Sequence, residues 1–250
     1  MAGVMIVTGG SRGIGAATAA MAASQGYDVC VNFVRDAAAA ERVVEKVRAA
    51  GRRAIAVQAD VGNEADIERL FKTVDQELGR VSVLVNNAAI VGQSRRRLEA
   101  LRAQSVNELL AANVTGAMIC AREAILRMST KHGGSGGVII NVSSASARMG
   151  APNLWVDYAA SKGAIDSFTI GLSQEVAGEG IRVNAVRPGL IDTEIHAATG
   201  MPDRLARAEK MIPMKRAGSA EEVAANIVWL ASPAASYVSG AILDVAGAVR

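Results

Sequence analysis

Short apolar runs alternate along the chain with longer segments in which apolar residues recur at helical spacing. Each run is continuously hydrophobic, whereas a strand with one face in water alternates apolar and polar positions. Seven runs predict strands, at residues 3–7, 28–33, 54–59, 81–85, 138–142, 181–186 and 241–245. Such strands are buried on both faces, so the pattern predicts an α/β fold with a mostly parallel sheet and helices on both faces.

The intervening segments predict helices at residues 13–25, 37–50, 63–78, 105–128, 155–176 and 219–230. A chain of 250 residues is long enough for one large domain or two small ones. Neither a linker nor a repeat divides it, so we expect one domain over residues 1–250. One long irregular segment, at about 193–215, contains Met201-Pro202 and Ile212-Pro213. A substrate lid and a plain surface excursion both fit such a segment.

The charge balance argues against a nucleic-acid partner. Lys and Arg number 27 and Asp and Glu 24, so the net charge is +3, and the pI near 9.1 follows from a small excess of Arg. Aromatic residues make up 3% of the chain, too few for the platforms on which bases stack. The one dense basic run, Arg95-Arg96-Arg97, is interpreted as a solvated loop.

Cysteine and histidine are too sparse for a disulfide framework or a metal site. Cys30 lies in an apolar run and Cys120 in a helical pattern, which predicts two buried thiols. The two histidines, His132 and His196, are far apart in sequence, so no metal is expected. The first residues do not resemble a secretory signal, and there is no run of about 18 apolar residues. We therefore expect a cytoplasmic protein without a membrane partner.

A glycine-rich turn follows the first predicted strand and leads into the first predicted helix. Its sequence is Thr8-Gly9-Gly10-Ser11-Arg12-Gly13-Ile14-Gly15. Backbone without side chains can approach a pyrophosphate closely, and a helix amino terminus supplies free N–H groups and a partial positive charge. The context favours a dinucleotide site over a tight turn without a ligand, although the spacing differs from G-x-G-x-x-G.

The chain resembles the short-chain dehydrogenases/reductases over nearly its whole length. The glycine turn is similar to that family's TGxxxGxG motif. Further motifs follow in the family's order: Asp60-Val61, Asn86-Asn87-Ala88-Ala89, Asn113, Ser143-Ser144, Tyr158-Ala159-Ala160-Ser161-Lys162, and Pro188-Gly189 with Thr193. The resemblance implies a Rossmann-type, doubly wound seven-stranded sheet, hydride transfer with a nicotinamide cofactor, a small carbonyl or alcohol substrate, and a homotetramer.

The resemblance also implies which residues bind the cofactor. Asp60 would hold the adenine amino group, Val61 would pack beside the ring, and Asn87 and Ala88 would lie under the ribose. The implied set is Gly9, Ser11, Arg12, Gly13, Ile14, Gly15, Asn32, Phe33, Arg35, Asp60, Val61, Asn87, Ala88, Ala89, Tyr158, Lys162, Pro188, Gly189, Ile191 and Thr193.

The choice between NAD and NADP is made at the end of the second predicted strand. An acid there would bind the ribose 2′-hydroxyl and repel a 2′-phosphate. The chain has Asn32-Phe33-Val34-Arg35 instead, with no acid before Asp36. Arg12 and Arg35 could pair bidentately with a 2′-phosphate. We expect NADP(H) to be preferred, with NAD(H) possible.

Tyr158 and Lys162 stand four residues apart in a predicted helix, so their side chains share one face. The pKa of a free tyrosine is about 10, and acid–base work near neutrality requires a pKa lower by about three. An ammonium about 5 Å away contributes roughly 3 kcal/mol at an effective dielectric constant of about 20, and an oxidised nicotinamide adds positive charge. The pair can therefore transfer protons, although YxxxK alone is a common pattern.

Two further residues complete the catalytic set. Ser143-Ser144 follows the predicted strand 138–142, at the edge where open α/β sheets bind ligands. We assign the hydroxyl that binds the substrate oxygen to Ser144, which is 14 residues before Tyr158. Asn113 resembles a family asparagine that holds a water linking the lysine to solvent. The predicted catalytic residues are Asn113, Ser144, Tyr158 and Lys162.

Three positions depart from the family's pattern. Ala89 replaces a common glycine, Asp244-Val245-Ala246-Gly247 stands where many members have V-D-G-G, and Arg187 replaces a small residue. We expect Arg187 to lean toward the active site or the cofactor edge, and His196 to lie in a loop or at the substrate mouth. Glucose 1-dehydrogenase-like and 3-oxoacyl carrier-protein reductase-like members both fit. A non-catalytic dinucleotide-binding sensor is the alternative from another class.

Overall fold

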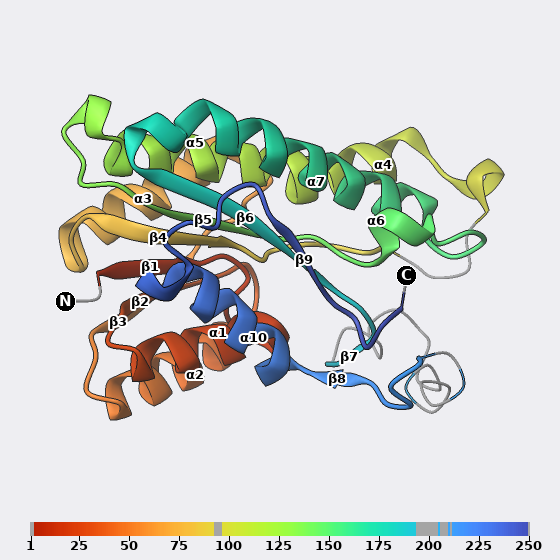
Figure 1. Cartoon of the computed structure of the whole chain (residues 1–250), viewed down its shortest axis with the longest axis horizontal. Coiled ribbons are helices and arrows are strands. Elements are labelled where there is room, and N and C mark those ends of the chain that lie inside the picture. The colour runs from red at the N-terminus through yellow and green to blue at the C-terminus, as the bar shows by residue number, and fades with distance from the viewer. Residues whose placement is uncertain (1–2, 93–96, 194–204, 206–209, 211, 250) are drawn as a thin grey trace.

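The computed structural model describes residues 3–92, 97–193, 205, 210 and 212–249. Seven strands form one sheet in the order β3-β2-β1-β4-β5-β6-β9, and every neighbouring pair is parallel (Figure 1). The strands are β1 Val4–Val7, β2 Asp28–Phe33, β3 Ala54–Gln58, β4 Val81–Asn86, β5 Gly137–Val142, β6 Ile181–Pro188 and β9 Ile242–Val245. The predicted doubly wound sheet is confirmed, with its switch point between β1 and β4, where such sheets bind ligands.

Two helical layers cover the sheet, as predicted. Figure 1 shows α1, α2 and α10 on one face and α3, α5 and α7 on the other. The helices are α1 Gly13–Ser24, α2 Ala37–Ala49, α3 Glu64–Glu77, α4 Ala103–Leu110, α5 Gly116–Met128, α7 Val156–Val176 and α10 Ala220–Ala231. Met5 of β1 packs into the same core as Ile227 of α10, whereas the next residue, Ile6, packs into the same core as Phe71 of α3. Successive strand residues thus point into two cores, which is why the strands are apolar throughout.

Local features that the pattern did not predict lie near the carboxyl ends of the strands. The expected helix 105–128 is split into α4 and α5 by a π-helical turn at Ala111–Thr115. A short helix, α6 Ser146–Met149, follows β5. A two-stranded sheet pairs β7 Ile191–Asp192 with β8 Gly218–Ser219 and closes the base of the irregular segment. Figure 1 shows α4, α6, β7 and β8 at the same end of the sheet as the C-terminus.

Of the predicted lid at 193–215, only Thr193, residues 205 and 210, and 212–215 are described, and His196, Arg95 and Arg96 lie outside the described residues. Cys30 and Cys120 are both fully buried and unpaired, as predicted.

Within the described chain, Ala103–Met128 is the one helical stretch long and apolar enough to cross a membrane, and it packs against β4 in the helical layer.

Candidate active site

The glycine turn brings the ends of β1 and β4 together without space for side chains. Gly9 and Gly13 have φ values of 61° and 53°, in the region that favours glycine. A Cβ on Gly15 would lie 2.5 Å from the Gly9 carbonyl oxygen and 2.6 Å from Nδ2 of Asn87. A Cβ on Gly9 would lie 2.9 Å from Cα of Ala88. The main chain here forms a bare cradle at the amino end of α1, which fits a pyrophosphate.

Thr8, which the sequence analysis did not select, holds this cradle in place. Its hydroxyl donates to the Val85 carbonyl at 3.2 Å and accepts the N–H groups of Asn87 and Ala88, both at 3.0 Å. The Asn87 amide donates back to the carbonyls of Thr8 and Gly9 at 2.8 and 3.0 Å. Its only sequence signal was its place between the first strand and the glycines, where a hydroxyl can bond to the backbone.

Asn32 and Phe33 act on this site through the backbone. Oδ1 of Asn32 accepts the Gly9 N–H at 3.2 Å, and its Nδ2 donates to the Ala59 carbonyl at 2.9 Å. The Phe33 ring is buried in the hydrophobic core. The two side chains therefore fix the end of β2 and the glycine turn.

The two predicted 2′-phosphate ligands, Arg12 in the glycine turn and Arg35 after β2, are both exposed. Arg12 stands directly before α1 with an extended backbone, and Arg35 follows β2. Neither guanidinium has an ion pair with another residue of the described chain. The first acid after β2, Asp36, accepts the Ala39 N–H at 2.8 Å as the cap of α2. Among the described residues, both guanidiniums are therefore left without a carboxylate partner.

The predicted adenine side consists of Asp60 and Val61. Asp60 is exposed, and its Oδ1 accepts the Gly62 N–H at 2.8 Å. Val61 is buried, and a Cβ on Gly116 of α5 would overlap its carbonyl oxygen. The close approach of α5 to Val61 thus explains a glycine at the start of that helix.

The residues predicted to border the nicotinamide lie at or after the end of β6, and one of them, Thr193, is close to the glycine turn. Gly189 donates to the Val245 carbonyl at 3.0 Å, and a Cβ on it would lie 2.8 Å from Cα of Ala246. Thr193 Cγ2 lies 3.4 Å from the place of a Cβ on Gly13. Segments about 180 residues apart in sequence are therefore adjacent in the fold.

Lys162 lies buried beside the ring of Tyr158 on α7. Its Nζ is 5.7 Å from the Tyr158 ring centroid and donates to the Val142 carbonyl at 2.7 Å. The Ser143 hydroxyl donates to the Lys162 carbonyl at 3.2 Å, which ties the end of β5 to α7. Burial lowers the pKa of Lys162 to about 8, against an opposing effect of Asp166. The ammonium is therefore present at neutral pH next to the phenol.

Asn113 lies in the π-helical turn and is buried. Its amide donates to the Ile90 carbonyl at 2.8 Å and to the Ser161 hydroxyl at 3.1 Å, and that hydroxyl donates to the Tyr158 carbonyl at 2.7 Å. Oδ1 accepts the Ile90 N–H at 2.8 Å. Asn113 thus connects the loop after β4 to the helix of Tyr158, and π-helical turns are frequent at functional sites.

Ser144 lies at the carboxyl end of β5, directly after Ser143. Its hydroxyl accepts the Ser146 N–H at 3.1 Å at the start of α6. The next N–H, of Ala145, donates to the Pro188 carbonyl at 2.9 Å and fixes this corner against β6. The structure therefore brings Ser144 to the same sheet edge as the Lys162 side chain.

A constrained apolar wall beside Tyr158 was missed by the sequence analysis. The backbone before α7 is left-handed at Gly150, Ala151 and Asn153, with φ values of 71°, 44° and 59°. Such values are costly outside glycine and cluster at functional sites. The segment packs Ala151 and Trp155 against Tyr158, together with Val91 and Leu154. The residue pattern of this segment gave no sign of this geometry.

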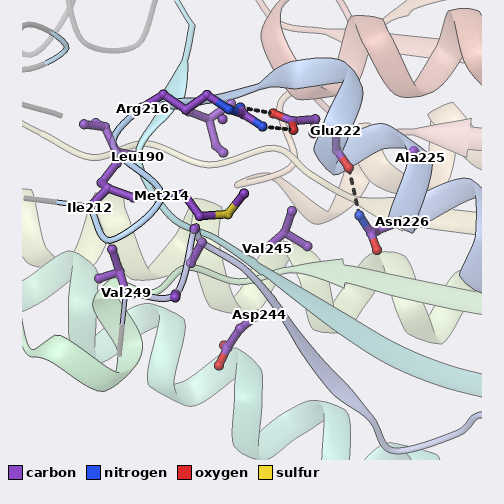
Figure 2. Close-up of a pocket in the computed structure, with 15 residues that line it drawn as sticks. Leu190, Ile212, Met214, Arg216, Glu222, Ala225, Asn226, Asp244, Val245 and Val249 are labelled. Atoms are coloured by element: carbon purple, nitrogen blue, oxygen red, sulfur yellow. Dashed lines mark hydrogen bonds and ion pairs between the residues drawn. The ribbon is translucent and has the colours of Figure 1, made fainter. Parts of the chain in front are cut away.

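The end of the predicted lid segment, at residues 212–215, lies beside a pocket of about 650 Å³. Arg216 forms a two-armed ion pair with Glu222 near the start of α10, and Asn226 donates to the Glu222 carbonyl (Figure 2). Met214 donates to the Gly247 carbonyl at 3.3 Å. Leu190 and Ile191 contribute to the lining, but the four predicted catalytic residues do not.

The Arg187 side chain, which was expected to lean toward the active site or the cofactor edge, is held by two carboxylates. Its guanidinium pairs with Asp166 of α7 at 2.8 Å and with Asp244 of β9 at 3.5 Å. The guanidinium is partly exposed, and one carboxylate on each of two neighbouring elements compensates its charge. Across the described residues, no cluster of three or more His, Cys, Asp or Glu side chains could hold a metal ion.

Comparisons with known proteins agree with this geometry. The family model described as "Enoyl-(Acyl carrier protein) reductase" matches residues 9–249. The uncharacterized oxidoreductase YgfF of Escherichia coli (strain K12) is 51% identical over 244 residues, 98% of each chain. A 3-oxoacyl-[acyl-carrier-protein] reductase of Synechocystis sp. is 39% identical over 248 residues, 98% of this chain and 95% of the relative.

A solved structure is similar over the same extent. The short-chain dehydrogenase from Burkholderia cenocepacia J2315 in complex with NADP superposes with a TM-score of 0.87 at 32% identity, covering 97% of this chain and 96% of that one. Agreement of this extent in sequence and structure shows that the chain belongs to the short-chain dehydrogenase/reductase family of nicotinamide-dependent oxidoreductases.

Proposed function

We propose that this protein is an NADP(H)-dependent oxidoreductase that interconverts a small carbonyl compound and its alcohol, with Tyr158 as the acid–base. The observation that carries the proposal is the buried Lys162 ammonium, 5.7 Å from the Tyr158 ring centroid, at the sheet edge that also carries the glycine turn. A positive charge at this distance stabilises the phenolate and brings the Tyr158 pKa toward neutrality.

Each catalytic residue has its own proposed role in the reaction. When bound, the nicotinamide supplies the hydride in reduction and accepts it in oxidation. Tyr158 gives its proton to the substrate oxygen in reduction and takes it back in oxidation. Ser144 donates a hydrogen bond to that oxygen and orients it. Lys162 stabilises the phenolate and binds the ribose, and Asn113 holds the helix of Tyr158 in place and supports a water relay to Lys162.

The cofactor preference rests on Arg12 and Arg35. Both are exposed and have no ion pair within the described chain, and Asp36 caps α2. A 2′-phosphate would satisfy both guanidiniums, whereas NAD(H) would leave them in solvent. The NADP complex of the Burkholderia relative supports the same choice.

The substrate class is either sugars or 3-oxoacyl thioesters, as the resemblance implies. By the same resemblance we propose a homotetramer, and from the sequence pattern of the first residues we propose a cytoplasmic location.

A spectrophotometric screen tests the proposal. NADPH oxidation is measured with ketoacyl thioesters, quinones and aromatic carbonyls, and NADP⁺ reduction with sugars and alcohols, each in parallel with the NAD form. Turnover with at least one class, faster with the NADP form, is expected. Tight NADPH binding without turnover on any class would instead favour the non-catalytic sensor.

A further inference from the structure

A row of alternating charges extends from the buried Lys162 ammonium toward the surface. Asp166 lies four residues after Lys162 on α7, so both side chains share one face of the helix, and both are buried. Oδ2 of Asp166 lies 2.9 Å from Nε and 2.8 Å from Nη2 of Arg187 on β6. Arg187 also faces Asp244 of β9 at 3.5 Å, and Asp244 pairs with Arg148 of α6 at 2.7 Å.

The backbone fixes this row. Arg187 and Asp244 are register partners in the adjacent parallel strands β6 and β9, so their side chains leave the same face of the sheet. Helix α7 packs against β6, and α6 packs against α7. Arg187 therefore lies between the two carboxylates because of where the strands and helices run.

Asp166 keeps one acceptor without a partner. Oδ2 takes both contacts from Arg187, whereas Oδ1 is buried and accepts no hydrogen bond from the described residues. A buried carboxylate in this state attracts the nearest cation. Burial lowers the pKa of Lys162, and Asp166 acts in the opposite direction, so the two groups interact. Without Arg187, Asp166 would compete with Tyr158 for the Lys162 ammonium.

We propose that Arg187 is a positioning residue for the proton-transfer pair: by holding the Asp166 carboxylate, it leaves the Lys162 ammonium to Tyr158 and so sets the pH range in which Tyr158 exchanges its proton. This inference rests on the proposed function, because Tyr158 must be the group that ionises.

The other described elements around Lys162 bring no second carboxylate that could take the place of Asp166. Strand β5 and the residue after it contribute the Val142 carbonyl and the Ser143 hydroxyl, and the π-helical turn contributes the Asn113 amide. On α4, Glu108 is exposed and accepts from Gln104.

The remaining acid near the pair is on α7 itself. Asp157 is five residues before Lys162, which places it on a different side of the helix. The charges that decide the environment of Lys162 are therefore Asp166 and its partner Arg187.

Removing one charge of this pair has a predictable sign. A negative charge beside a phenol disfavours the phenolate and raises its pKa, and loss of that charge lowers it. Replacing Arg187 leaves Asp166 uncompensated, so Tyr158 titrates at higher pH. Replacing Asp166 leaves Arg187 as an extra cation, so Tyr158 titrates at lower pH. Replacing both restores the original balance.

The test is a spectroscopic titration of Tyr158 in the whole protein without substrate. Phenolate absorbance is followed against pH for each variant and for the same variant with Tyr158→Phe, and the difference separates Tyr158 from the other two tyrosines. We expect Arg187→Met to raise the midpoint by roughly one pH unit, Asp166→Asn to lower it, and the double variant to return near wild type. Arg148→Met removes the outermost charge and is the matched control, with the smallest shift.

Thermal unfolding first shows whether both variants are folded. An unchanged Tyr158 titration midpoint in folded Arg187→Met and in folded Asp166→Asn would overturn the inference. If Arg187→Met does not fold, Asp166→Asn decides alone, because its midpoint has to fall. The proposed function fails by a different result: Tyr158→Phe turning over a substrate at near-normal rate, whatever the titration gives.

Discussion

The ammonium of Lys162 lies 2.7 Å from the main-chain carbonyl oxygen of Val142, at the last residue of β5. This is the one hydrogen bond of the ammonium found within the described chain. The carbonyl therefore holds the cation in the protein interior, where burial lowers the pKa of Lys162 to about 8. Lys162 is placed for chemistry at a cost in stability.

Replacement of Lys162 by methionine is expected to abolish turnover without destabilising the fold. Moving the pKa from 10.5 to about 8 corresponds to about 3 kcal/mol of unfavourable burial at neutral pH, and loss of the charged hydrogen bond to Val142 offsets about 1.5–3 kcal/mol of the gain. We expect the free energy of unfolding to stay the same or to rise by up to about 1.5 kcal/mol, and kcat/KM to fall at least about 100-fold. Urea unfolding and steady-state kinetics measure both. A destabilised Lys162→Met variant would contradict this account of the burial.

The stability difference should also depend on pH. Below about pH 8 Lys162 is protonated in the folded and unfolded states, so the full penalty applies; above about 10.5 it is neutral in both. The stability of Lys162→Met relative to that of the wild type should therefore fall as pH rises from about 8 to 10.5. Unfolding free energies of both proteins across this range give the slope, and a constant difference would show that Lys162 is not buried as a cation.

The glycine cradle predicts a steric loss of cofactor binding. Alanine at Gly15 would place its Cβ 2.5 Å from the Gly9 carbonyl, so we expect NADPH affinity to fall at least about 100-fold and the melting temperature to drop. Gly171 of α7 has open space around it, so Gly171→Ala is the matched control. It should bind NADPH normally and gain about 0.5–1 kcal/mol of stability. Calorimetric titration and thermal unfolding compare the two, and normal NADPH binding by Gly15→Ala would refute the cradle.

The arginine pair predicts a selective loss of NADPH. Each of Arg12→Ala and Arg35→Ala removes charged hydrogen bonds to a 2′-phosphate, each worth about 1.5–3 kcal/mol, so NADPH affinity should fall about 10- to 100-fold while NADH affinity changes little. Arg42→Ala, also exposed and on α2, is the control and should leave both unchanged. The measurement is the dissociation constant of NADPH and of NADH for the wild type and for each variant. Equal losses for NADPH and NADH would mean that neither arginine reads the phosphate.

The sequence predicted the sheet because burial on both faces leaves a continuous apolar run. Strand β2 agrees with its predicted range, and β1, β3 and β9 differ from theirs by one end residue. The π-helical turn around Asn113 was missed because its residues keep a helical pattern. The β7–β8 pair was missed because each strand has only two residues.

Within the site, motif spacing located the residues but not their partners. Tyr158 and Lys162 are separated by one helical turn, so their shared face followed from the sequence. The pairing of Arg187 with Asp166 joins β6 to α7, and the support of Gly9 by Asn32 joins the glycine turn to β2. Contacts of this kind depend on register and on helix packing, which one sequence does not specify. The strained backbone at Ala151 is set by its surroundings in the same way.

Turnover by Tyr158→Phe tests the central claim most directly. The variant keeps the ring that packs against Trp155 and Ala151 and removes only the hydroxyl. With the substrate identified in the screen, we expect kcat/KM to fall about 100- to 10,000-fold. The affinity for NADPH should stay within about threefold of that of the wild type. Near-normal turnover with normal NADPH binding would show that another group transfers the proton.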